Sequence, residues 1–237
     1  AFCYQLHNLP YRDFRPTLQL SSLLDPKGSH FLLEHGVWDE PILWSNLNTN
    51  VPILKEDKKS KIFKNGGYVI FAPVKENWSL FRCPIYKFRP AHADPLHFDL
   101  WSNGINILRD GGSFSYNSFE KDLNYFSGIE AHNTIQFNGH QPMIRLGRYL
   151  WGNWLNSAYN YDLRTDKNLS FESSYKFNFG FHKRKIEVTS CGKYWEITDS
   201  INSFNSQAII RWRLAPIKWD YKNKKITSSM ASLSFSS

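Results

Sequence analysis

Cysteine and methionine are scarce in this 237-residue sequence, which contains three and two of them respectively. Cys3, Cys83 and Cys191 lie far apart, are odd in number and show no Cys-x-x-Cys spacing. They therefore support neither a disulfide framework nor a zinc site built from cysteines.

Long hydrophobic runs are also missing. No apolar run approaches the roughly 18 residues that a membrane-spanning helix needs, and no charged and then apolar leader marks a signal peptide. We therefore expect no membrane span. Because the chain begins at Ala1, we expect it to be either processed or part of something longer, so this says little about compartment.

The composition is that of a globular protein, with 41% hydrophobic and 16% aromatic residues. Lys and Arg exceed Asp and Glu by 29 to 21, a formal charge of +8. This surplus favours an anionic partner, without choosing among nucleic acid, acidic polysaccharide and a phospholipid surface. The interleaved basic and aromatic residues of RNA-binding domains are not seen, so we expect no nucleic-acid partner.

Residues 1–60 differ in pattern from the rest of the chain. Prolines are frequent, and the segment ends in the charged run KEDKKSK. We expect an irregular, partly helical leader, with short helices near Ser29–Leu33 and Pro41–Leu47.

From Gly66 onward the hydrophobic period is two. Short β-branched or aromatic runs are bounded by Gly, Pro and Asn, as is typical of strands and hairpins. Asn103-Gly104 and Cys191-Gly192 fall between such runs and predict turns. We expect residues 61–237 to form an all-β domain, a large antiparallel β-sandwich. The runs are GGYVIFAP, NWSLFRCP, LHFDLWSN, INILRDGG, HNTIQFNG, SYKFNFGF, RKIEVTSCGKYWEITDSI and QAIIRWRLAPIKWDYKNKKI.

Residues 89–116 contain two histidines, His92 and His97, and several carboxylates, and His132 follows 22 residues after Asp110. Two imidazoles and a carboxylate converging from neighbouring strands have the composition of a metal site. A strand over Leu96–Trp101 would turn Leu96, Phe98 and Leu100 to the core, and His97, Asp99 and Trp101 to the other face. We expect His97 and Asp99 on a solvated or inter-strand face rather than as a catalytic pair.

Four ordered blocks of the sequence resemble the C-terminal β-sandwich of the heparinase II/III family of polysaccharide lyases. The resemblance covers roughly residues 60–205, and the leader resembles the connection from an α-helical toroid that precedes the sandwich in this family. The blocks are GGYVIFA, RPAHADPLHFDLWSNGINILRDGGSFSYN, EAHNTIQFNG and FHKRKIEV.

The resemblance implies β-elimination on an acidic polysaccharide that contains uronic acid, with an Asn, a His and a Tyr as typical catalytic groups, the Asn and Tyr coming from the toroid. It also implies a metal site at His92, Asp110 and His132. Zinc suits two histidines and a carboxylate with an open position, and calcium is the alternative. The family's substrate-facing His falls on Pro90, which can neither transfer a proton nor bind a metal. A periplasmic or secreted location is expected, although this chain does not show it.

Each candidate also has a plainer interpretation. His92 and His132 could bind backbone groups at strand ends, and Asp110 could cap the turn at Gly111-Gly112, with or without a metal. Asp94 could fix its turn or orient His92. His140 suits a hairpin turn.

The remaining candidates concern catalysis and sugar binding. Tyr116 could be the lyase acid or a packing residue, and His97 is a second catalytic candidate. Trp101 and Trp151 could stack on sugar rings, or belong to the core. Arg145 and Arg148 could pair with uronate or sulfate, or form a solvated basic edge. We expect the run HKRK at His182–Lys185 to be an exposed strand.

Two rival functions remain. One is a non-catalytic glycan-binding or structural sandwich, which Pro90 favours. The other, hydrolysis by Asp94 and Asp99, is the least favoured because these two carboxylates lie only five residues apart on one strand.

Overall fold

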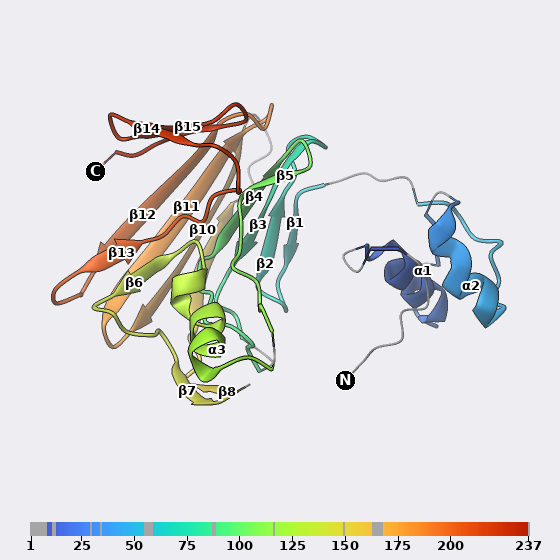
Figure 1. Cartoon of the computed structure of the whole chain (residues 1–237), viewed down its shortest axis with the longest axis horizontal. Coiled ribbons are helices and arrows are strands. Elements are labelled where there is room, and N and C mark those ends of the chain that lie inside the picture. The colour runs from blue at the N-terminus through green and yellow to red at the C-terminus, as the bar shows by residue number, and fades with distance from the viewer. Residues whose placement is uncertain are drawn as a thin grey trace. The chain divides into compact units, whose positions relative to one another are not determined.

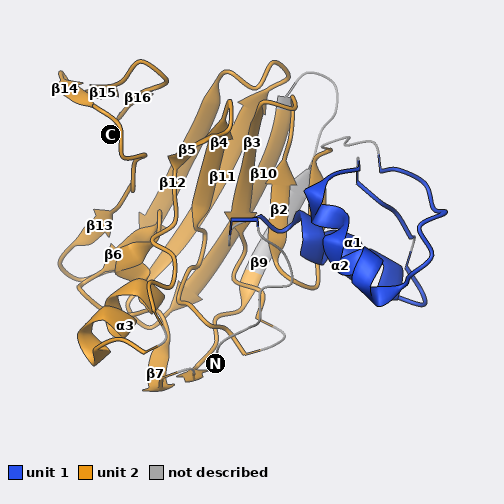
Figure 2. Ribbon diagram, turned by 45° about the vertical axis from the view of Figure 1, so that its right-hand side comes forward, with its two compact units in different colours: residues 1–57 blue, residues 58–237 orange. Residues whose placement is uncertain are grey.

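The computed structural model describes residues 9–10, 13–28, 30–33, 35–54, 59–86, 89–115, 117–148, 150–162 and 168–236. The chain divides into two compact units, Ala1–Asp57 and Lys58–Ser237 (Figure 2). No helix in these described ranges has the length and apolar character needed to cross a membrane.

The first unit contains the helices α1 (Arg15–Leu24) and α2 (Glu40–Ser45) and the short 3-10 helix η1 (Val37–Asp39). The side chain of Gln19 is fully buried and joins these parts. Its Nε2 donates to Oδ1 of Asp39 at 2.6 Å, and its Oε1 accepts from the backbone N–H of Leu33 at 2.8 Å. One buried amide therefore holds α1 to two later segments.

The predicted helix near Pro41–Leu47 corresponds to α2, but the predicted helix near Ser29–Leu33 is wrong. Leu32 forms an isolated parallel bridge with Ile53, and the N–H of Phe31 donates to Oγ of Ser22 at 2.8 Å. The backbone of Phe31 and Leu32 is thus paired with the Ser22 side chain and with the segment around Ile53, so it cannot form the hydrogen bonds of a helix. The sequence prediction also missed α1. The frequent prolines, Pro16 among them, suggested irregular structure, but proline is tolerated in the first turn of a helix.

The second unit is built around two antiparallel sheets. The five-stranded sheet has the order β1-β2-β3-β4-β5, and the four-stranded sheet has the order β12-β11-β10-β9. The strands are β1 (Lys61–Phe63), β2 (Tyr68–Phe71), β3 (Asn77–Arg82), β4 (Phe98–Ser102), β5 (Ile105–Leu108), β9 (Ser157–Asp162), β10 (Asn168–Phe177), β11 (Gly180–Thr189) and β12 (Trp195–Asn202).

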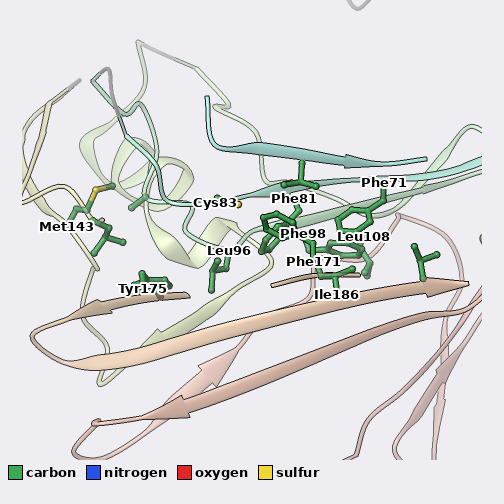
Figure 3. Packing of buried hydrophobic residues seen from close by; sticks show 14 of the residues in the cluster. Phe71, Phe81, Cys83, Leu96, Phe98, Leu108, Met143, Phe171, Tyr175 and Ile186 are labelled. Atoms are coloured by element: carbon green, nitrogen blue, oxygen red, sulfur yellow. The ribbon is translucent and has the colours of Figure 1, made fainter. Parts of the chain in front are cut away.

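The core lies between these two sheets, as the period-two pattern predicts. Along β11 every second residue is buried. Phe71 and Phe81 from the first sheet meet Phe171 from the second, with ring centroids 6.4 and 5.7 Å apart, in edge-to-face geometry (Figure 3). The second unit therefore has the β-sandwich fold expected from the sequence.

Smaller elements lie around the sandwich. Figure 1 shows the helix α3 beside β6 and β7. The sequence prediction missed α3, whose eight residues have only one buried side chain, that of Leu123. These elements are α3 (Glu120–Ser127), η2 (Ile129–Ala131), β6 (Ile135–Phe137), β7 (Ile144–Gly147), β8 (Leu150–Gly152), β13 (Ala208–Ile210), β14 (Asp220–Lys222), β15 (Lys225–Thr227) and β16 (Ser232–Ser234).

Both predicted turns are present. Asn103 and Gly104 have φ values of 49° and 77° between β4 and β5, and Gly192 has a φ of 66° between β11 and β12. The strand predicted to begin at Leu96 begins at Phe98 instead. Leu96 adopts a left-handed conformation with a φ of 56°. The regular strand therefore does not extend back to His97 or His92.

Candidate metal centre

Three residues far apart in the sequence come together in the second unit. His92 precedes β4, Asp110 follows β5, and His132 follows η2. One ligand atom from each residue lies within 4.8 Å of the other two. The structure thus brings together the three residues that the sequence analysis assigned to a metal site.

A close contact between Gly111 and Ala131 sets the distance between Asp110 and His132. The N–H of Gly111 donates to the carbonyl oxygen of Ala131 at 3.0 Å. A Cβ atom on Gly111 would lie 2.9 Å from both Cβ and the carbonyl oxygen of Ala131. Only glycine permits this approach, which places Asp110, just before Gly111, beside His132, just after Ala131.

His132 is 2% exposed and contacts the carboxylate directly. Its Nδ1 lies 2.6 Å from Oδ2 of Asp110, so Nδ1 carries the proton of this hydrogen bond. Nε2 of the neutral ring is then an acceptor, and it is buried without a hydrogen-bond partner among the described residues. A buried polar atom of this kind calls for a partner outside the protein, such as water or an ion.

Asp110 has both of the roles considered for it. Its Oδ1 accepts from the N–H of Gly112 at 2.5 Å, which caps the turn, while Oδ2 faces His132. Burial raises the pKa of Asp110, but the hydrogen bond from His132, the electrostatic interactions with His132 and His97, and the hydrogen bond from the Gly112 N–H outweigh burial. The pKa is therefore well below the usual range, and the carboxylate stays ionised.

His92 completes the group from a loop that is held on both sides. Trp151 Nε1 donates to the carbonyl oxygen of Ala91 at 3.1 Å, and the N–H of Ala93 donates to the carbonyl oxygen of Ser127 at 2.8 Å. Nε2 of His92 lies 3.2 Å from Oγ of Ser113. Burial, followed by the charge of His132, lowers the pKa of His92. A neutral imidazole is the form that binds a metal.

The family model described as Heparinase II/III-like, C-terminal, matches residues 55–232. The chain belongs to this family. Among curated proteins, none matches the sequence significantly.

Two solved lyase structures share the fold of this Heparinase II/III-like chain. One is described as a heparinase III, the BT4657 gene product with methylated lysines, and has a TM-score of 0.66 at 14% identity over 92% of this chain. The other is a mutant of the heparan sulfate lyase HepC from Pedobacter heparinus, with a TM-score of 0.60 at 15% identity over 90% of this chain. The match takes in only 32% of each of those proteins, so the chain spans about a third of their length.

In this Heparinase II/III-like domain, His97 and Asp99 lie on a buried inter-strand face, so the solvated alternative is wrong. They are 5% and 8% exposed. Nδ1 of His97 accepts from the backbone N–H of Asn133 at 2.9 Å, and Asp99 accepts from the N–H of Asp110 at 3.3 Å. This burial gives no support to a catalytic role for His97, because the ring has little contact with the surface.

Asn133 is a site residue that the sequence analysis missed. It is fully buried, and its Nδ2 donates to the carbonyl oxygens of Phe98 and Arg109, at 2.9 and 3.2 Å. Its Oδ1 accepts from the N–H of Arg213 at 2.6 Å. Its only sequence signal is its place directly after His132. It ties three segments around the candidate ligands together.

The two predicted sugar-stacking tryptophans differ in their surroundings. Trp101 is half-buried and stacks on Trp78, with ring centroids 5.4 Å apart and planes 7° apart. Trp151 is 3% exposed and belongs to the core cluster. Its indole fixes the loop before His92, so the expectation that Trp151 offers a ring face to a sugar is wrong.

The two predicted anion-binding arginines also differ. Nη1 of Arg145 donates to the carbonyl oxygen of Leu123 and to Oγ of Ser127, at 3.1 and 2.6 Å. Its Nη2 donates to the carbonyl oxygen of Arg148 at 3.1 Å. Arg145 thus links β7 to α3, whereas Arg148 is exposed. Tyr116, the predicted lyase acid, lies outside the described residues.

The run His182–Lys185 was expected to be an exposed strand, but only part of it is exposed. His182 and Arg184 are fully buried, whereas the lysines between and after them are partly exposed. Nε and Nη2 of Arg184 donate to the two carboxylate oxygens of Asp199, at 2.7 and 2.9 Å, and Nε2 of His182 lies 2.7 Å from Oδ1. The buried half of the run is an ion-pair network.

Asp94 fixes its turn, one of the two roles considered for it, because its carbonyl oxygen accepts from the backbone N–H of His97 at 3.2 Å. Within the described part of the chain, its Oδ1 accepts from the hydroxyl of Tyr86 at 3.1 Å, and its Oδ2 lies 3.5 Å from Nε of Arg82. It stabilises the loop before β4 without contacting His92.

His140 closes a turn after β6, with its N–H donating to the carbonyl oxygen of Phe137 at 2.8 Å. The expected hairpin is not formed, because β6 pairs with β13 and β7 pairs with β8. The His140 ring stacks on Phe179, with ring centroids 4.0 Å apart.

Proposed function

We propose that this chain is the metal-binding β-sandwich domain of a polysaccharide lyase that cleaves an acidic glycan by β-elimination. The carrying observation is the group His92, Asp110 and His132, in which a buried ring nitrogen of His132 has no hydrogen-bond partner among the described residues. Membership of the Heparinase II/III-like family and a formal charge of +8 support the same proposal. The solved relatives carry the names heparinase III and heparan sulfate lyase.

Zinc is the metal that these residues fit best. Two imidazoles and one carboxylate match the three protein ligands of open zinc sites, whereas calcium, the alternative, prefers six to eight oxygen ligands. The pKa values of His92 and Asp110 are both lowered, so both side chains are in their metal-binding forms at neutral pH. A bound divalent cation would supply fixed positive charge that orders its loops and offsets the charge of a sugar carboxylate.

The groups that move protons come from elsewhere in the protein. β-Elimination needs a base for the C5 proton and an acid for the departing O4. Pro90 stands where the family has its substrate-facing histidine, and His97 is buried. Because the chain spans only about a third of its solved relatives, we propose that a preceding α-helical toroid domain of the same protein supplies the catalytic groups, with Tyr116 as a further candidate.

The glycan would be held by residues outside the metal group. We propose that Arg148, which is exposed, pairs with uronate or sulfate groups and that Arg145 contributes from β7. Trp101, stacked on Trp78, is the proposed aromatic contact for a sugar ring. Since acidic polysaccharides of this kind lie outside the cytoplasm, we propose a periplasmic or secreted location.

The experiment is to incubate the whole protein with heparan sulfate, alginate and hyaluronan and to follow the absorbance of unsaturated uronate. We expect an increase with at least one substrate, lost in a His92→Ala, His132→Ala double variant. A matched His140→Ala variant should keep the activity, since His140 stacks on Phe179 and is not one of the three proposed ligands. No unsaturated product from any of these substrates would contradict the lyase proposal.

Pro90 favours a second candidate, a non-catalytic glycan-binding or structural domain. This candidate predicts that the protein is retained on a column of immobilised heparin and elutes with salt, while no substrate is cleaved. Retention without cleavage would support it over the lyase.

A further inference from the structure

His97 differs from the three proposed metal ligands in the way its two ring nitrogens are used. Its Nδ1 accepts a hydrogen bond of 2.9 Å from the backbone N–H of Asn133. A nitrogen that accepts such a bond carries no proton, so Nε2 of the neutral ring must carry it. The backbone of Asn133 thus selects one tautomer.

The surroundings of Nε2 favour the same tautomer independently. Nε2 lies 3.5 Å from Oδ2 of Asp110 and 3.9 Å from Oδ2 of Asp99. Two carboxylate oxygens facing an unprotonated nitrogen would repel its lone pair, whereas both attract an N–H. Because the His97 side chain is buried, this attraction is little weakened by water.

A protonated Nε2 cannot bind a cation. His97 accordingly lies outside the group of three residues whose ligand atoms lie within 4.8 Å of one another, although its ring centroid is 5.5 Å from that of His132. Metal-binding carboxylates commonly depend on neighbouring donors that fix their orientation. Nε2 of His97 is buried without a hydrogen-bond partner among the described residues, and Oδ2 of Asp110, 3.5 Å away, is the carboxylate oxygen nearest to it.

Rigid contacts hold His97 and Asn133 in this arrangement. Nη1 of the fully buried Arg184 donates to the carbonyl oxygens of Leu96 and Asn133, at 2.8 and 2.7 Å. Leu96 immediately precedes His97 and has the left-handed φ of 56°. One guanidinium therefore fixes the backbone on both sides of the His97 and Asn133 contact.

We propose that His97 is a positioning residue of the metal centre, whose Nε2–H keeps the Asp110 carboxylate turned toward His132 and His92. The proposal rests on the proposed metal site. It assigns to His97 neither proton transfer nor metal binding. It explains why a histidine is buried between two carboxylates beside the candidate ligands.

The first test reads the tautomer without any metal. Long-range proton–nitrogen NMR correlations of the metal-free protein separate ring nitrogens with and without a proton, and the signals absent from a His97→Gln variant identify those of His97. We expect an unprotonated Nδ1 and a protonated Nε2. A proton on Nδ1 would overturn the proposal, whether or not the protein binds zinc.

The second test measures affinity for Zn²⁺ alone, by competition with a chromophoric chelator, in His97→Leu and His97→Gln variants. We expect roughly 10- to 100-fold weaker binding in His97→Leu. His97→Gln should lose less, because its side-chain amide can still donate to Asp110. His140→Leu is the control, since the His140 ring stacks on Phe179 and has no part in the Arg184 contacts, and its zinc affinity should equal that of the unchanged protein.

The outcomes separate this proposal from the metal site on which it rests. If the unchanged protein binds no zinc, the metal site itself is wrong, and the positioning role falls with it. If the unchanged protein binds zinc and a folded His97→Leu variant binds it equally well, only the positioning role is wrong. Circular dichroism establishes folding, and the tautomer measurement decides the proposal if His97→Leu does not fold.

Discussion

Arg184 Nη1 donates to the carbonyl oxygen of Asn133 at 2.7 Å. Arg184 lies on β11 in the four-stranded sheet, and Asn133 directly follows the candidate ligand His132. The same guanidinium also forms a two-bond ion pair with Asp199 on β12. This buried arginine thus connects one sheet of the sandwich to the loop that carries the candidate metal centre.

Replacing Arg184 with Met should strongly destabilise the domain. The substitution leaves Asp199 buried without its main cation and removes two bonds to backbone carbonyls, which should lower the free energy of unfolding by about 3–5 kcal/mol. Urea unfolding followed by tryptophan fluorescence measures this loss. The neighbouring Lys183→Met is the control: its pair with Glu172, at 3.2 Å, is partly exposed, so its loss should be below about 1 kcal/mol. Equal effects of the two variants would contradict a buried anchoring role.

Asp199 should make stability depend on acid. Burial raises the pKa of Asp199, but the charge of Arg184 and the hydrogen bonds from His182 and Arg184 have the larger, opposite effect. The pKa of Asp199 therefore lies well below its usual value. A carboxylate with a lowered folded-state pKa contributes stability above its unfolded pKa of about 3.9, and this contribution is lost as the pH falls below that value. The free-energy difference between the unchanged protein and Asp199→Asn should therefore be large at pH 7 and shrink below about pH 4. Urea unfolding at several pH values measures it, and a difference that stays constant would refute the assignment.

Gly111→Ala adds only one methyl group but should clearly disturb the metal centre. The added Cβ would meet the Ala131 backbone at 2.9 Å, so Asp110 must move relative to His132, and zinc affinity should fall by roughly tenfold or more. Gly104→Ala is the control. Its position is open but has a φ of 77°, so it should cost about 1 kcal/mol of stability and leave zinc affinity unchanged. Titration with zinc compares the two variants, and unchanged affinity in Gly111→Ala would show that the contact does not set the site.

The sequence predicted the sandwich because strands with one buried face alternate in hydrophobicity, as β11 does. It also predicted the group His92, Asp110 and His132, through the resemblance of the surrounding blocks. The burial of His97 and Arg184 could not be predicted. Both residues look polar and exposed in a period-two pattern, and their partners Asn133 and Asp199 come from distant segments.

The helices were also poorly predicted, for local reasons. Pro16 lies in the first turn of α1, where backbone N–H groups form no hydrogen bond within the helix, so the N–H that proline lacks is not needed. α3 is a surface helix of only eight residues with one buried side chain, too short to be distinguished in the sequence. These elements depend on contacts with the rest of the chain more than on their own sequence.

Elemental analysis of the protein purified without added metal tests the metal centre most directly. We expect close to one zinc per chain in the unchanged protein and close to none in the His92→Ala, His132→Ala double variant, with His140→Ala as the control that keeps its metal. A metal content near zero in the unchanged protein, or one that the double variant retains, would contradict the account.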